Sequence, residues 1–201
     1  MGHLVLLGGG HAHLSLLDAA PRLVAAGHRV TLVTPEPEHY YSGMGPGMLG
    51  GWYTPSEICF PLERMAADAR VAFVRDRAVR IRPDDRQVDL AGGATIAYDV
   101  LSLNTGSSIA PTVAVDDDLP GSGPRVFTVK PLQEMVQARR FVESRAARSP
   151  VSVVVVGGGP AAVETAAAFR RLIDSAAPEA ARRSEVTLIA GRTILPVDCC
   201  M

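Results

Sequence analysis

The sequence predicts an α/β fold built on parallel sheets, because one strand, turn, helix and strand pattern occurs twice in its 201 residues. In the first copy, the apolar residues 4–7 precede three glycines, a helical pattern interrupted by Pro21, and a second strand at 29–33. In the second copy, a β-branched strand from Val151 precedes glycines 157–159, an alanine-rich helix from about Pro160, and the strand in "EVTLIAG". A helix that joins two parallel strands packs back on their sheet.

The residues between the two copies have a different pattern of apolar and turn residues. Residues of about 70–103 read as three or four short strands separated by turns at "PDDR" and "AGG", and we expect an antiparallel β-meander there. Residues 35–57 are rich in Gly, Pro and aromatic residues, which predicts a functional loop without regular structure. A helix of about 133–148 with an exposed basic face would connect this region to the second copy.

The glycine turns have the chemistry of a pyrophosphate site, since free amides and the positive end of a helix stabilise negative charge. The spacing gives Gly8, Gly10 and His13 in the first turn, and Gly157, Gly159 and Ala162 in the second. The alternative is that the glycines only make sharp turns, but two matches in the required context favour a Rossmann-like, three-layer dinucleotide-binding fold. An imidazole in place of a small third residue should push helix and strand apart or turn outward.

Composition excludes some partners. A net charge of -1 predicts no basic surface for binding nucleic acid, and no apolar run reaches the ~20 residues of a membrane span. Since the amino terminus has no basic region before its apolar stretch, we expect a cytoplasmic protein. The three cysteines, Cys59, Cys199 and Cys200, lack metal-ligand spacing, so we expect no metal site and a reducing compartment.

Four blocks, "LVLLGGGHAH", "RVTLVTPEPEHYYSGMGPGMLGG", "YDVLSLNTGS" and "VVVVGGGPAAVET", follow one another along nearly the whole chain. In these blocks the sequence resembles the flavin-dependent pyridine nucleotide-disulfide oxidoreductase superfamily. It is most similar to the branch with type II NADH dehydrogenases and sulfide:quinone oxidoreductases. The segments "GGGHAH" and "YSGMGPG" resemble those of flavoproteins associated with selenide, water dikinase. The resemblance implies FAD in a first module, NAD(P)H in a second, and hydride transfer from nicotinamide to flavin.

The same resemblance implies which residues bind these cofactors. For FAD they are Gly8, Gly9, Gly10, His11, Ala12, His13, Thr34, Glu36, Met44, Pro46, Val79, Asn104, Thr105 and Gly106. For NAD(P)H they are Gly157, Gly159, Pro160, Ala161, Ala162 and Arg192.

Glu164 matches a glutamate that approaches flavin and nicotinamide, where a carboxylate could manage protons. The alternative is an ordinary first-turn glutamate stabilised by the helix dipole. Departures from the family also carry information. Thr34 replaces an acidic ribose-binding residue, with Glu36 two residues on. Arg192 follows a position without an acidic residue, which hints at NADPH.

The flavin-side pair of cysteines found in the disulfide branch is missing, which makes a dithiol reductase a poor match. We expect Cys59 to be a buried structural thiol, and no role follows for Cys199 and Cys200.

The expected organisation is an FAD-binding module at 1–125, a connecting segment and helix at 126–150, and the start of an NAD(P)H-binding module at 151–201. Only about one βαβ unit follows Val151, so we expect the second module to be incomplete, with the carboxyl-terminal half of the family pattern missing. Two hypotheses stay open: an FAD-dependent NAD(P)H oxidoreductase with a small-molecule acceptor such as a quinone, or a nucleotide-binding fragment without turnover. Uncovered sheet edges favour self-association, and peripheral membrane contact would need the missing region.

Overall fold

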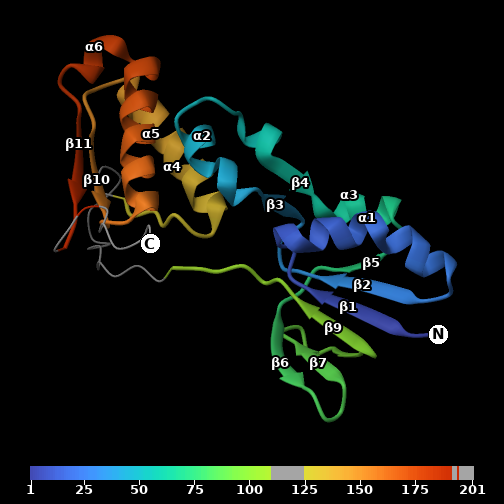
Figure 1. Cartoon of the computed structure of the whole chain (residues 1–201). Helices are drawn as coiled ribbons and strands as arrows, with labels where there is room; N and C mark the ends of the chain where they lie inside the picture. Colours follow the sequence, from blue (N-terminus) through green and yellow to red (C-terminus); the bar gives the residue numbers. More distant parts are fainter. Residues whose placement is uncertain (110–124, 192–193, 195–201) are drawn as a thin grey trace, which may run out of the picture. The chain divides into compact units, whose positions relative to one another are not determined.

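The computed structural model describes residues 1–109, 125–191 and 194 of the chain (Figure 1). These residues divide into two compact units. The first unit contains Met1–Tyr41 and Cys59–Ser107, and the second contains Ser42–Ile58 and the described residues of Ser108–Met201. Each unit is built around one of the two glycine turns. Arg192, Cys199 and Cys200 lie outside the described residues.

The first unit is organised by a four-stranded sheet in the order β5-β2-β1-β9. All three pairings in this sheet are parallel, and β1 lies between β2 and β9. Its strands are β1 (His3–Leu7), β2 (Arg29–Val33), β5 (Ala72–Val74) and β9 (Val100–Leu103). The predicted strands at 4–7 and 29–33 are therefore confirmed, and so is their parallel pairing.

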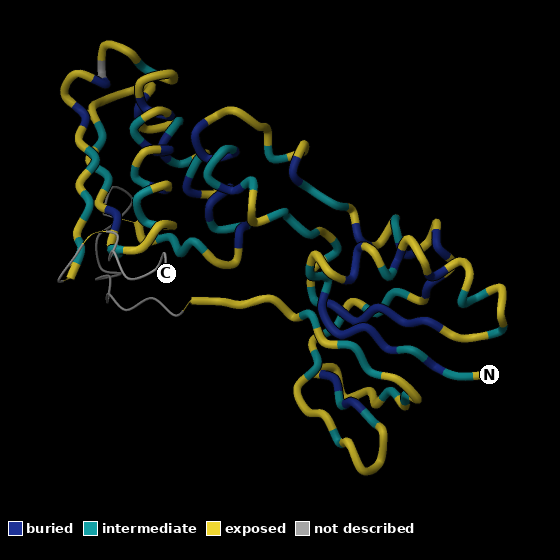
Figure 2. Tube along the Cα trace, viewed as in Figure 1, coloured by how far each residue is buried: buried dark blue, intermediate teal, exposed yellow. Residues whose placement is uncertain are grey.

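Both faces of this sheet are covered, which explains why β1 is a nearly continuous apolar run. On one face, Leu6 and Leu32 pack with residues of α1 (His11–Ala25) and α3 (Leu62–Asp68). On the other face, Val5, Leu7 and Val33 pack with Val88 and Leu90 of the meander. Figure 2 shows β1 and β2 as the most deeply buried strands of this unit. The predicted three-layer arrangement is confirmed.

The antiparallel meander is shorter than the sequence predicted. It contains only β6 (Ala78–Arg82), β7 (Gln87–Leu90) and β8 (Thr95–Ala97). The strands at its predicted ends, β5 and β9, instead pair in the parallel sheet. The sequence pattern could not separate them, because short apolar strands look alike whether their partners run parallel or antiparallel.

The region 35–57 also has more regular structure than predicted. It contains β3 (Glu38–Tyr40), the 3₁₀ turns η1 (Ser42–Met44) and η2 (Pro55–Ile58), and the helix α2 (Gly45–Leu49). Strand β3 pairs antiparallel with β4 (Cys59–Pro61) in the first unit. The prediction of an irregular loop was wrong here, because Pro46 stands in the first turn of α2, where a helix tolerates proline.

The second unit contains the second copy of the motif. Strands β10 (Ser152–Val156) and β11 (Glu185–Ile189) pair in parallel and are joined by α5 (Pro160–Ala176) and the short α6 (Pro178–Ala181). Helix α4 (Leu132–Ala146) precedes them, close to the predicted 133–148, and both α2 and α4 pack on α5. Pro160 occupies the first helical position, as expected.

Helix α1 differs from its prediction at one point. It continues through Pro21 to Ala25 without interruption, and the amides of Ala26 and Gly27 close it on carbonyls of Arg22 and Val24. The buried face of Leu14, Leu17 and Ala20 holds the helix on the sheet, so tertiary packing outweighs the hydrogen bond that proline removes.

Candidate functional site

The first glycine turn is held tightly between strand ends. The amide of Gly8 donates to the Val33 carbonyl at 2.8 Å, and the amide of Gly10 donates to the Asn104 carbonyl at 3.1 Å. A Cβ atom at Gly8 would lie 2.5 Å from Thr105 Cα, and one at Gly10 would lie 2.5 Å from Asn104 Cγ. Gly8 also has a φ of +89°, which L side chains rarely adopt. These glycines are therefore required by contacts within the protein.

The turn nevertheless leaves backbone donors open. The Gly9 amide makes no hydrogen bond among the described residues. The amides of His11 and Ala12 lie in the first turn of α1, where backbone N–H groups have no carbonyl partner within the helix. His11 and Ala12 are exposed, and the first turn of α1 has no acidic side chain. Open amides at the positive end of a 15-residue helix are suited to a phosphate group.

His13 is placed differently from its prediction. Its side chain is only 1% exposed, with Nδ1 2.7 Å from the Gly8 carbonyl and Nε2 2.9 Å from Ser102 Oγ on β9. The imidazole does not turn outward, because its two polar partners hold it inside the protein. Both ring nitrogens are used inside the protein, so the side chain is not free to contact a cofactor.

The ends of β2 and β9 flank the first turn. Thr34 follows β2 and is buried, while Glu36 is exposed two residues further on. Asn104 follows β9, and Thr105 and Gly106 are exposed beyond it. The carboxyl ends of parallel strands are where ligands bind in open α/β sheets. These predicted residues therefore follow the carboxyl ends of the two strands that pair with β1.

Val79 lies at a β-bulge. The pairing of β6 with β7 shifts register between Ala78 and Arg80, which leaves Val79 as the extra residue on its strand. A bulged residue is unpaired in the ladder, so its backbone groups are available to another partner. The contact of the Val79 backbone with a cofactor stays a prediction, and the sequence showed no sign of the bulge.

A histidine and tyrosine cluster lies beside the amino end of α1. The rings of His11 and Tyr41 are 4.7 Å apart, and those of His39 and Phe60 are 6.3 Å apart. Burial, followed by the neighbouring His11, lowers the pKa of His39. His39 Nε2 is buried without a hydrogen-bond partner among the described residues, and such a group costs roughly 1–3 kcal/mol. A polar ligand atom would relieve it.

The second glycine turn is more open than the first. The Gly157 amide donates to the Ile189 carbonyl at 2.8 Å, and a Cβ at this glycine would lie 3.0 Å from Ala162 Cβ. A Cβ at Gly159 would meet nothing within 4 Å. Pro160 and Ala161 are exposed at the start of α5. Its amino end has no acidic residue in the first turn.

Glu164 is exposed on α5 and lies beyond that first turn. The alternative of a first-turn, dipole-stabilised glutamate is therefore wrong, while its proton-managing role stays a prediction. Met44 and Pro46 also belong to the second unit, where both are half-buried. Arg192, the residue expected to discriminate NADPH, lies outside the described residues.

Cys59 is half-buried in β4 rather than fully buried. Burial and the nearby Glu38 raise the pKa of its thiol, which keeps it protonated and weakly nucleophilic. The neighbouring Tyr40 donates a hydrogen bond to Glu38 Oε2 at 3.1 Å, and burial with these neighbours raises the pKa of Tyr40 to about 12. This environment is that of a structural thiol.

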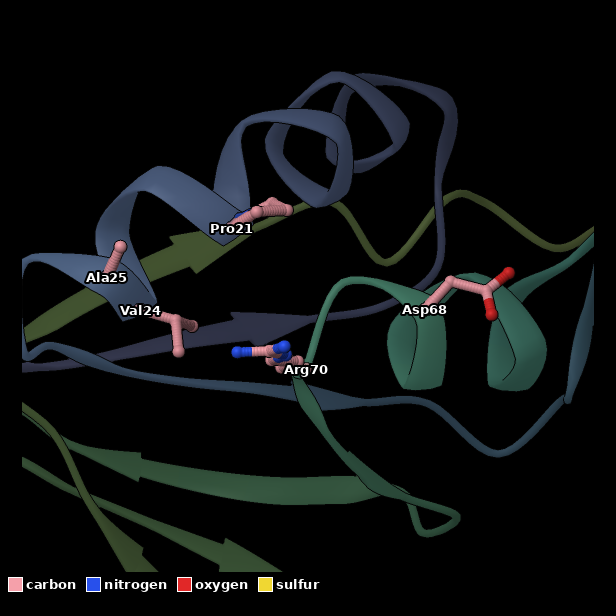
Figure 3. Close-up of a pocket in the computed structure, with 5 residues that line it drawn as sticks. All are labelled: Pro21, Val24, Ala25, Asp68 and Arg70. Carbon is pink, nitrogen blue, oxygen red and sulfur yellow. The ribbon is translucent and has the colours of Figure 1, made fainter.

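A separate hollow lies at the opposite end of α1 from the glycine turn (Figure 3). Its lining residues are Pro21, Val24, Ala25, Asp68 and Arg70. Asp68 forms an exposed ion pair with Arg64 at 3.8 Å, and none of the predicted site residues lines the hollow. Within the described residues, no group of three His, Cys, Asp or Glu side chains is placed to hold a metal, and no helix could span a membrane.

A parallel sheet with a glycine turn that opens onto a helix, an antiparallel meander on the other face and a second βαβ unit define a Rossmann-like FAD-binding fold. The family model for pyridine nucleotide-disulphide oxidoreductases matches residues 2–198. The chain belongs to this family, whose members typically bind FAD and NAD(P)H.

One protein is similar in sequence to this chain, and two solved structures are similar in fold. The oxidoreductase ptaL of Pestalotiopsis fici is 28% identical over 177 residues, which cover 83% of this chain and 44% of that protein. The sulfide:quinone oxidoreductase of Aquifex aeolicus has the same fold, with a TM-score of 0.70, 20% identity and coverage of 94% of this chain and 43% of that one. NDH2 of Plasmodium falciparum, solved with NADH, gives a TM-score of 0.68, 15% identity and coverage of 97% and 43%. The chain thus spans less than half the length of each relative.

Sequence reasoning missed three contributors to the site. Ser102 is the polar residue in the strand "VLSL", and a polar residue at a half-buried position between apolar neighbours signals a polar partner. His39 and Tyr41 lie in a segment that was predicted only as a functional loop. Their proximity to His11 depends on the pairing of β3 with β4, which local sequence does not encode.

Proposed function

We propose that this chain binds FAD at the first glycine turn and forms part of a flavin-dependent NAD(P)H oxidoreductase. The open amides of Gly9, His11 and Ala12 at the amino end of α1 carry this proposal. They would hold the pyrophosphate, while Thr34 and Glu36 would lie toward the ribose and the Val79 backbone toward the adenine. Asn104, Thr105 and Gly106 border the same sheet edge.

Bound FAD would supply a hydride acceptor, and the protein would supply orientation and charge balance. Gly157, Gly159 and the first turn of α5 would bind NAD(P)H, since this turn repeats the same arrangement of strand, amides and helix. Glu164 would manage a proton near the nicotinamide. A quinone is the acceptor we favour, because the fold is shared with a sulfide:quinone oxidoreductase.

Charge at the first turn tests the FAD site without disturbing packing. Ala12 is exposed, and Ala12→Glu would place a carboxylate where the pyrophosphate should bind. A glutamate near a helix amino end does not destabilise the helix, so lost affinity would report on the ligand. We expect FAD, followed by its visible bands at about 370 and 450 nm, to bind the parent chain and to bind Ala12→Glu at least about tenfold more weakly.

Two further variants serve as controls. Ala12→Gln has a similar shape without the charge and should retain most of the affinity, and Ala19→Glu adds the same charge on an exposed position further along α1. If the parent chain shows no flavin bands after incubation with FAD, the proposed site is wrong. Equal affinity of Ala12→Glu and Ala12→Gln would also contradict it.

A second candidate function is dinucleotide binding without turnover. The sheet of the second unit favours it, because a whole dinucleotide-binding domain has more parallel strands than the pair β10 and β11 that the described residues form there. NAD(P)H oxidation by the FAD-loaded chain with a soluble quinone separates the two. Oxidation above the rate of free FAD supports the enzyme, and no oxidation despite bound FAD supports the binding protein.

A further inference from the structure

The buried histidine in the first glycine turn is more than a space-filling residue. His13 is the third residue of α1, in the position where the motif normally has a small residue. Its ring contacts two other elements, the Gly8 carbonyl at the end of β1 and the Ser102 hydroxyl on β9, at 2.7 and 2.9 Å. The imidazole therefore links helix, turn and strand.

The partners determine the tautomer of this histidine. A carbonyl oxygen only accepts hydrogen bonds, so His13 Nδ1 carries the proton and donates to Gly8. In the neutral ring, Nε2 then has a lone pair and accepts from the Ser102 hydroxyl. Donor and acceptor capacities are both satisfied, as expected for a polar ring with 1% exposure.

The hydrogen bond to Gly8 also fixes the next amide. In a planar trans peptide, the carbonyl of Gly8 and the N–H of Gly9 point in opposite directions. A Gly8 carbonyl held toward His13 therefore directs the Gly9 N–H away from the imidazole. That amide has no partner among the described residues and is one of the donors assigned above to the pyrophosphate.

Gly8 needs such a restraint more than most residues. Its φ of +89° is open to glycine, but glycine also has the widest choice of other conformations. Contacts with Asn104 and Thr105 limit the position of the turn, yet none of the described hydrogen bonds other than that from His13 orients the Gly8 carbonyl.

We propose that His13 is a positioning residue of the FAD site, which acts through the Gly8–Gly9 peptide and is itself held by Ser102. This inference rests on the proposed function, because it assigns the Gly9 amide to FAD. It assigns the imidazole no contact with the cofactor. It also explains how the motif accepts a large third residue, since the ring replaces close packing with two directed hydrogen bonds.

The test compares the parent chain with His13→Phe, Ser102→Ala and the control Ser15→Ala, an exposed serine on the same helix. His13→Phe keeps an aromatic ring without either hydrogen bond, and we expect FAD to bind about tenfold more weakly. Ser102→Ala is a small change that keeps the proposal testable if His13→Phe does not fold, and we expect a loss of about threefold. Ser15→Ala should bind like the parent.

Nitrogen-15 NMR provides readouts that a merely structural role would not move. The His13 ring should show the Nδ1–H tautomer, and the FAD-induced shift of the Gly9 amide should shrink in both variants more than that of Val79. An Nε2–H tautomer, or unchanged affinity and Gly9 shifts in both variants, overturns the positioning role alone. A parent chain that binds no FAD overturns this inference together with the proposed function.

Discussion

The two copies of the strand, glycine turn, helix and strand motif share a local pattern but differ in their surroundings. Strand β1 is paired on both sides and buried on both faces, with Val5 and Leu6 fully inaccessible. Strand β10 pairs with β11, and its outer face exposes Val154 and Val156 at 54% and 64%. The same motif can therefore be embedded in a three-layer core or lie at one face of a unit.

Among the helices, the second copy is the more enclosed one. Helix α1 buries one stripe of residues against the sheet, and its other residues are half-buried or exposed. Helix α5 packs on β10 and β11 and is also in contact with α2 and α4. Arg139 of α4 strengthens this second layer by donating to the carbonyls of Met48 and Tyr53 at 2.6 and 2.8 Å. The comparison shows that the first copy is stabilised from the sheet side and the second from the helix side.

The motif glycines should give the largest contrast between the copies. Gly10 and Gly159 each precede the first residue of a helix, so Gly→Ala changes the cap equally at both. At Gly10 the new methyl group would collide with Asn104, whereas at Gly159 it would meet nothing within 4 Å. We expect Gly10→Ala to lower the free energy of unfolding of its unit by about 3 kcal/mol and Gly159→Ala by less than about 1 kcal/mol. Urea titration measures both, and equal losses would remove this distinction.

The third residues of β1 and β10 test the sheet faces. Val5→Thr buries a hydroxyl against the meander and should lower the free energy of unfolding by about 2 kcal/mol. Val154→Thr makes the same change on an exposed face and should stay within about 0.5 kcal/mol. Thermal melting monitored by circular dichroism compares them. A loss at Val154 as large as that at Val5 would mean that the outer face of β10 is covered in solution.

Arg139 tests the helix side of the second copy. Arg139→Met removes the side-chain donor from the carbonyls of Met48 and Tyr53, of which the Met48 carbonyl keeps the Gly51 amide, and we expect a loss of about 1 kcal/mol. Amide hydrogen exchange should become faster in residues 48–53. Arg140→Met, which changes an exposed neighbour, is the matched control. Unchanged exchange in Arg139→Met would show that α2 is held on α4 and α5 by apolar contacts alone.

The smallest expected effect is a dependence on pH at the start of β1. His3 bonds Thr31 and Arg29, and burial, then the charge of Arg29, lowers its pKa below 6.5. The unfolded chain therefore binds this proton more readily. The contribution of His3 to stability is complete above pH 6.5 and is lost as the pH falls toward the lowered pKa of the folded state.

His3→Gln should weaken this pH dependence in the first unit. The corresponding first residue of β10 is Ser152, which does not titrate, so the second copy provides an internal comparison. Urea midpoints at several pH values between 5 and 7 measure the effect. An identical pH profile in the parent and in His3→Gln would contradict the assignment to His3.

Much of the fold follows from the sequence because its signals are local. The apolar runs, the glycine turns, Pro160 at the start of α5 and the alanine-rich helix each specify an element or its boundary. The assignment of β5 and β9 to the parallel sheet depends on pairing over long sequence distances. The packing of residues 42–58 in the second unit also depends on contacts over long sequence distances, and no local pattern predicts it.

The candidate site shows the same limit. The glycines of the first turn were predicted as ligand-binding residues, but their contacts with Asn104 and Thr105 show a second, internal requirement. His13 was expected to disturb the motif, and only the position of Ser102 across the sheet explains how the imidazole fits. Residue identity predicted where a dinucleotide would bind, while the tertiary contacts determined which backbone donors remain open.

The proposed function depends on FAD binding at the first glycine turn. Hydrogen exchange of the parent chain with and without FAD tests it most directly, because each amide reports separately. We expect slower exchange at residues 9–12, 79 and 104–106, with the amides of 157–159, 161 and 162 unchanged until NAD(P)H is added. Protection confined to 157–162, or no protection anywhere at saturating FAD, would contradict it.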